Sequence, residues 1–68
     1  MPEHVKVMHG NYMRWATESR ANAERARKLA DADLALAPAH RKRAAKAEAR
    51  AMEYEDKANA LLNAAEAV

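Results

Sequence analysis

The chain has 68 residues, half of them hydrophobic, and a formal net charge of +2 at pH 7. A chain of this length forms at most one domain with a small core, and such domains often gain stability by oligomerising or by binding a partner. The absence of cysteine excludes a disulfide framework and a thiolate metal site, and the small net charge argues against a general nucleic-acid or membrane binder.

The composition predicts an all-α protein. Alanine, the strongest helix former, makes up more than a quarter of the residues, and there is a single glycine. No apolar run approaches the roughly 18–20 residues of a membrane-spanning helix. The first ten residues lack the apolar core of a signal peptide. We therefore expect a small cytoplasmic protein, and the alanine and arginine content hints at a bacterial or phage origin.

A first helix is predicted over about residues 3–35. Val5, Met8, Tyr12 and Trp15 follow helical spacing. Gly10 could end a short helix here, and the next residue could cap another. The apolar spacing crosses this point without a slip, which favours one continuous helix.

A seven-residue repeat runs through most of the chain. Alanine recurs at every seventh position without interruption, at Ala16, Ala23, Ala30, Ala37, Ala44, Ala51, Ala58 and Ala65. Three residues after each alanine come Ser19, Ala26, Asp33, His40, Ala47, Tyr54, Leu61 and Val68. Two positions that recur in this way form the apolar seam of a coiled coil, and here the seam consists mostly of alanine.

The stretch LALAPAHRKR, residues 34–43, interrupts the helical pattern at Pro38. Inside a helix, proline removes a hydrogen bond and clashes with the preceding turn, at a cost of roughly 3 kcal/mol. In the first turn of a new helix it costs nothing. We therefore predict a turn at about residues 36–38. The alternative is a single kinked helix within an intermolecular bundle.

A second helix is predicted over about residues 38–66. Folding the chain at the turn brings the two alanine rows together, as Ala16 with Ala58, Ala23 with Ala51 and Ala30 with Ala44. Small side chains on both sides allow a separation near the lower end of the usual ~8–10 Å. The predicted fold is an antiparallel two-helix hairpin with an alanine-rich seam, forming one domain over residues 1–68. We also expect it to dimerise into a four-helix bundle.

The charges beside the turn oppose the dipoles of their own helices. Two aspartates, Asp31 and Asp33, fall near the end of the first helix, and arginines open the second. In a hairpin these charges meet, so we expect Asp33 to lie near Arg41 and Asp31 near Arg43. Exposed pairs of this kind are worth roughly 0–1 kcal/mol each.

Large apolar residues gather in the half of the hairpin away from the turn. Two helices share only one mutual face, so these residues cannot all be buried within one hairpin, and leftover apolar surface usually marks an interface. We therefore expect a non-enzymatic protein-interaction module of the adaptor or inhibitor type, which binds a second copy, another protein, or both. The predicted contact residues are Met8, Tyr12, Met13, Trp15, Met52 and Leu62.

Basic residues gather in the other half, near the turn. They could contact phosphate groups or an acidic partner, or could form an ordinary solvated helix surface. A nucleic-acid-binding module is therefore the first alternative function, and a structural assembly subunit is the second. The candidate contacts are Arg25, Arg27, Lys28, Arg41, Lys42, Arg43 and Lys46.

Catalytic, cofactor and metal motifs are not found in the sequence. His4 and His9 are five residues apart and do not share a helix face, so they lack the spacing of paired metal ligands. Ser19 and Thr17 have no histidine predicted nearby to act as a base. We expect His40 to pack at the tip of the hairpin. The sequence predicts no catalytic residue, no cofactor and no metal ion.

Overall fold

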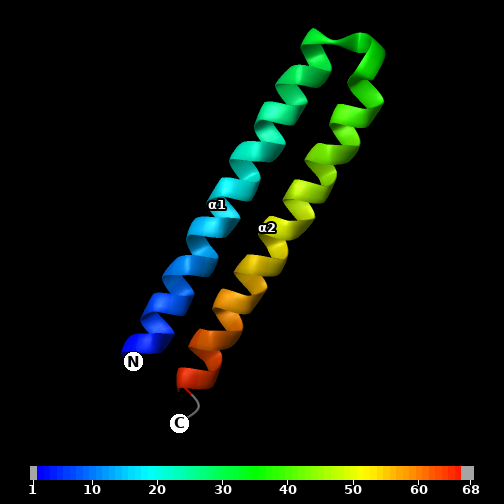
Figure 1. The fold of residues 1–68 in the computed structure, drawn as a ribbon. Helices are drawn as coiled ribbons and strands as arrows, with labels where there is room; N and C mark the ends of the chain where they lie inside the picture. The colour runs from blue at the N-terminus through cyan, green and yellow to red at the C-terminus, as the bar shows by residue number, and fades with distance from the viewer. Residues whose placement is uncertain (1, 67–68) are drawn as a thin grey trace.

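The computed structural model describes residues 2–66 and shows a helical hairpin. Helix α1 (Glu3–Ala32) and helix α2 (Ala37–Glu66) run antiparallel and are joined by the short 3-10 helix η1 (Leu34–Leu36) (Figure 1). The hairpin measures 53 × 15 × 10 Å. The predicted all-α, antiparallel two-helix fold is confirmed. We call the end where α1 begins and α2 finishes the open end.

Helix α1 is continuous through the only glycine of the chain. Its first turn is anchored by the carbonyl oxygen of Pro2, which accepts the backbone N–H groups of Val5 and Lys6 at 3.1 and 3.2 Å. Gly10 lies inside the helix and has no positive φ angle. The prediction of one continuous helix through Gly10, made from the apolar spacing, is therefore confirmed.

The turn begins earlier than the sequence suggested. Helix α1 ends at Ala32 rather than near residue 35, because Asp33 has non-helical angles (φ −126°, ψ 88°). The N–H of Asp33 donates to the Leu29 carbonyl at 2.8 Å, and its carboxylate accepts the N–H of Leu36 at 3.4 Å. Helix α2 then begins at Ala37. Pro38 falls in its first turn, where a missing N–H breaks no helical hydrogen bond.

The seam between the helices is made of alanine. Within residues 2–66, every buried hydrophobic side chain is an alanine: Ala16, Ala23, Ala26, Ala30, Ala37, Ala44, Ala51 and Ala58. Ser19 and His40, which hold seam positions in the seven-residue repeat, are also buried. The repeat read from the sequence therefore gives the face along which the helices meet.

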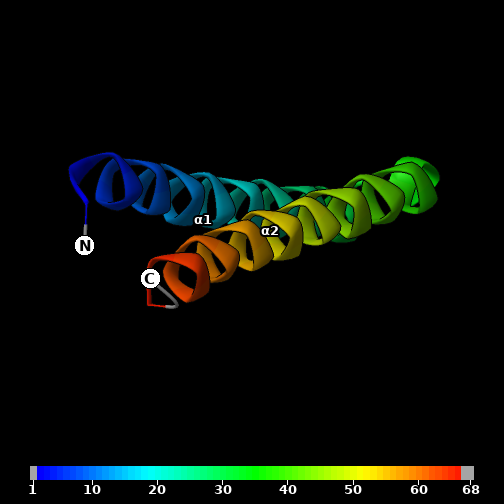
Figure 2. The ribbon, with the colours of Figure 1, turned by 90° about the horizontal axis from the view of Figure 1, so that it is seen from below.

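Side-chain size changes along the seam. Near the turn and in the middle the seam positions hold mostly alanine, whereas toward the open end they also include Tyr12 and Tyr54, which are only partly buried. Larger side chains hold helices further apart. Figure 2 accordingly shows the two helices inclined to each other, with their open ends turned apart.

Replacing a seam alanine with leucine should destabilise the hairpin. Ala23 and Ala51 are both fully buried, and overpacking a close contact costs roughly 1–3 kcal/mol. We expect Ala23→Leu and Ala51→Leu each to lower the free energy of unfolding by this amount in urea titrations. Ala21→Leu and Ala49→Leu, at exposed positions, are matched controls that should unfold like the parent. Equal stability of all four variants would show that Ala23 and Ala51 do not lie at a close contact between the helices.

Replacing the glycine should stabilise the hairpin. A Cβ atom built on Gly10 meets nothing within 4 Å, and alanine in a helix interior is favoured over glycine by roughly 0.5–1 kcal/mol. Gly10→Ala should therefore raise the free energy of unfolding by about that much. Unchanged or lower stability would indicate that α1 is not helical at this point in solution.

Candidate functional site

The two long edges of the hairpin, on either side of the seam, differ in chemistry. One edge carries the ion pairs between the helices, and we call it the paired edge. The other carries an open groove, and we call it the groove edge. Because a seven-residue step returns to nearly the same face of a helix, each exposed residue of α1 or α2 can be assigned to an edge by counting, within that helix, from a residue already placed there.

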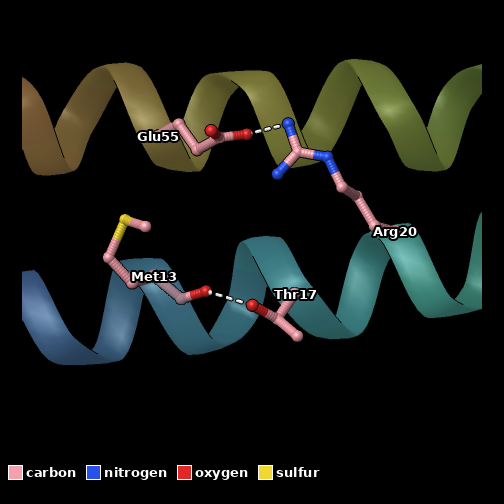
Figure 3. A network of polar contacts seen from close by, with 4 residues as sticks. All are labelled: Met13, Thr17, Arg20 and Glu55. Atoms are coloured by element: carbon pink, nitrogen blue, oxygen red, sulfur yellow. Dashed lines mark hydrogen bonds and ion pairs between the residues drawn. The ribbon is translucent and has the colours of Figure 1, made fainter.

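The paired edge holds two ion pairs one heptad apart. Arg20 pairs with Glu55 and Arg27 pairs with Glu48. Figure 3 shows the Arg20 guanidinium reaching across to α2, one turn along from Thr17, whose hydroxyl donates to the Met13 carbonyl at 3.0 Å. All four ionic side chains are substantially exposed, so each pair is worth about 0–1 kcal/mol and mainly helps to set the register.

These pairs correct the sequence-based prediction of charges meeting at the turn. Among residues 2–66, the ion pairs that join the helices are the two on the paired edge, and neither Asp31 nor Asp33 takes part. Asp33 instead accepts the Leu36 N–H, because the chain leaves helical angles at this residue. Asp31 and Arg41 line the same shallow depression beside Arg27 without forming an ion pair.

The groove edge concentrates positive charge. Its groove has a volume of about 440 Å³ and runs over a floor that includes Ala26 and Ala47. Its other lining residues are Asn22, Leu29 and the four cations Arg25, Arg43, Lys46 and Arg50. Within the described part of the chain no carboxylate lines this groove. The arrangement can bind an anionic group beside an apolar one.

The structure divides the predicted basic residues among several surfaces. Arg25, Arg43 and Lys46 come together in the groove, with Arg25 donating to the side-chain oxygen of Asn22. They are joined there by Arg50, which the predicted set omitted. Arg50 lies one heptad after Arg43, so the repeat itself could have identified it.

The remaining predicted basic residues lie elsewhere. Arg27 is engaged with Glu48 on the paired edge, and Arg41 lies one heptad before Glu48 on that same edge. Lys28 and Lys42 are exposed at the heptad position that faces away from the partner helix. The predicted basic half is therefore one cationic groove accompanied by separate solvated charges.

An aromatic cluster lies in the half toward the open end. Tyr12 and Tyr54 stack across the two helices, with ring centroids 6.3 Å apart. Trp15 lies 5.6 Å from each of them, edge-on to Tyr12 and tilted against Tyr54. Trp15 remains 36% exposed. It lies one heptad before Asn22 and therefore on the groove edge.

The predicted apolar contact residues are split between the two edges. Trp15 and Met8 lie on the groove edge, and Met13 and Leu62 belong to the paired edge by their heptad steps from Arg20 and Glu55. Met8, Tyr12 and Leu62 are partly buried, whereas Met13 is exposed. Met52, 62% exposed, lies in a depression beside the Arg20–Glu55 pair. These residues do not form a single continuous surface.

Sequence reasoning missed three exposed leucines near the turn. Leu29 is 48% exposed and lies two heptads after Trp15 on the groove edge, and Leu36, in η1, is 54% exposed. Leu34, also in η1, is 79% exposed. For Leu29 the signal was present in the seven-residue repeat, because it directly precedes the seam residue Ala30.

Residues 2–66 contain no group of three or more histidine or acidic side chains placed to hold a metal ion. Neither α1 nor α2 has an apolar stretch long enough to cross a membrane. Comparison with protein-family models, with curated proteins and with solved structures gave no match.

His40 packs at the hairpin tip, as the sequence predicted, and leaves a polar atom unsatisfied. Its side chain is buried and its Nδ1 atom has no hydrogen-bond partner. An unsatisfied buried polar group costs about 1–3 kcal/mol. We therefore expect His40→Leu to keep the helical content and raise the free energy of unfolding by about 1 kcal/mol. A loss of stability would mean that the imidazole makes an interaction that leucine cannot replace.

Proposed function

We propose that this protein is a non-enzymatic protein-interaction module, of the adaptor or inhibitor type, that binds through its exposed apolar side chains. One observation carries the proposal. The hairpin buries alanine at its seam while its tryptophan, two of its methionines and three leucines remain exposed. Tryptophan and methionine are among the residue types enriched where another protein covers a surface.

The exposed area supports the same proposal. The hairpin exposes 5008 Å² of surface, whereas a folded chain of its 7.6 kDa mass is expected to expose about 4,300 Å². A two-helix hairpin has only one internal face, so its surface is large for its mass. Binding to another protein, or to a second copy in a four-helix bundle, would remove part of this excess from water.

Nucleic-acid binding is the second candidate function, favoured by the cationic groove. Arginine and lysine side chains without neighbouring carboxylates are the usual means of contacting phosphates. The sequence as a whole has too small a positive excess for a typical nucleic-acid binder. A protein-interaction module would have a protein against Trp15 and the methionines, whereas a nucleic-acid binder would not need one there. Crosslinking from these positions therefore distinguishes the two functions.

A photo-crosslinking amino acid placed at the exposed apolar positions should capture a protein. We expect crosslinks to protein in cells of the native host from positions 13, 15 and 52, and none from the outward-facing positions 21 and 49. Mass spectrometry would show whether the captured protein is a second copy or a different chain. Crosslinks to nucleic acid alone would overturn the proposal and support the second candidate.

Truncating the tryptophan should weaken binding to the captured protein. Interface anchors of this kind commonly contribute about 2 kcal/mol or more, which corresponds to roughly a thirtyfold loss of affinity. Trp15→Ala should show this loss in titration calorimetry while circular dichroism stays helical. Val7→Ala, which removes an exposed side chain from the outward face, is the control and should bind normally. Equal affinities of the two variants would exclude Trp15 from the interface.

A further inference from the structure

The groove edge combines an apolar row and a cationic row that lie side by side. On α1, Trp15 and Leu29 are two heptads apart and both exposed, with the polar Asn22 midway between them. On α2, Arg43, Lys46 and Arg50 line the groove opposite Leu29. At Leu29 the apolar row meets the cationic row across the groove, with Ala26 and Ala47 between them.

The dimensions of these rows suit a helix. Residues one heptad apart on a helix are about 10.5 Å apart along its axis, so Trp15 and Leu29 are separated by about 21 Å. A partner helix repeats its own side chains at the same interval and could place one apolar residue against each. The alanine floor lets a third helix approach closely, as small side chains do between packed helices.

We propose that the groove edge binds an acidic amphipathic helix of a different protein. Its apolar face packs against Trp15 and Leu29, and its carboxylates meet Arg43, Lys46 and Arg50. This inference rests on the proposed interaction function and specifies the chemistry of the partner. The cations are densest in the turn-proximal half, because toward the open end Lys57 shares this edge with Glu18 and Glu53, which hold the same outer heptad positions as Arg25 and Lys46.

A nucleic acid fits this edge less well than a helix. Exposed leucines gain nothing from contact with phosphates, and Leu29 lies inside the groove itself. Trp15 is packed edge-on against Tyr12 and tilted against Tyr54, so part of its ring is already covered. Stacking on a base needs an accessible aromatic face. The apolar row is therefore better explained by a protein partner.

A second copy aligned turn to turn also fits the groove edge poorly. A symmetric dimer brings the same surface of each subunit together, so a contact that joined the groove edges in this alignment would place the Arg43 and Arg50 rows against each other. Like charges in close apposition disfavour association. The paired edge of a second copy is no better suited, since Glu48 and Glu55 are already engaged in ion pairs there.

The test uses the full chain and a designed helical peptide. The probe has about 20 residues, enough to cover the apolar row at 1.5 Å per residue, with leucine at heptad spacing and glutamate at the flanking positions. A second peptide has lysine in place of every glutamate, and a single-stranded and a double-stranded oligonucleotide represent nucleic acid. Binding is followed by anisotropy of the labelled probe and by the emission of Trp15, since the peptides contain no tryptophan.

Matched variants locate the binding surface. Arg43→Glu with Arg50→Glu reverses two charges in the groove, and Lys28→Glu with Lys42→Glu makes the same change in net charge on the outward face. We expect the acidic peptide to bind with a blue shift of Trp15 emission. The groove variant should weaken this binding about tenfold or more, and the outward variant by much less. Leu29→Ser should also weaken it, and the lysine peptide should not bind.

Several outcomes would overturn the inference. Tighter binding of an oligonucleotide than of the acidic peptide would assign the groove to nucleic acid. An equal loss of affinity in the groove variant and the outward variant would show that the peptide responds to net charge and not to the groove. Failure of the acidic peptide to bind, together with protein crosslinks from position 15, would reject the acidic helix but leave the interaction function standing. A dimer that buries Trp15 at micromolar concentration would assign the edge to a second copy.

Discussion

The close contact of alanine with alanine along the seam is the constraint on which the rest of the structure depends. Where Ala23, Ala26 and Ala44 meet, there is no room for a larger side chain between the helices. The large apolar residues are therefore displaced to the two edges or to the wider open end, where Tyr12, Trp15 and Tyr54 form their cluster. The seam thus determines both how the hairpin closes and what its surface offers.

The seam also separates the charges. Once the helices are antiparallel, one set of flanking positions brings Arg20 to Glu55 and Arg27 to Glu48. These carboxylates lie on the paired edge and leave the cations of the opposite edge without acidic neighbours in the groove. A chain with a small net charge can therefore present a strongly cationic surface, because the distribution of charge between the edges matters more than its sum.

The sequence was sufficient to predict the features that depend on periodicity and on proline. Alanine at every seventh position identified the seam, and Pro38 indicated the position of the turn. The end of α1 was wrong by about three residues, because the backbone at Asp33 depends on a local hydrogen bond to Leu36. The predicted pair of Asp33 with Arg41 was wrong for the same reason, and Asp31 lines a depression with Arg41 instead of pairing with Arg43. The groove was missed because its residues come from both helices.

The small seam also links stability to binding. Burial of alanine removes little apolar area per residue from water, so the hairpin gains limited stability from its own core. The apolar area of Trp15, Leu29 and Leu36 stays exposed in the hairpin and would add stability only if another surface covered it. A partner that binds only the folded hairpin stabilises it by mass action. On the proposed function, folding and recognition therefore draw on separate residues: alanine at the seam closes the hairpin, and the larger side chains on its edges remain free to select the partner.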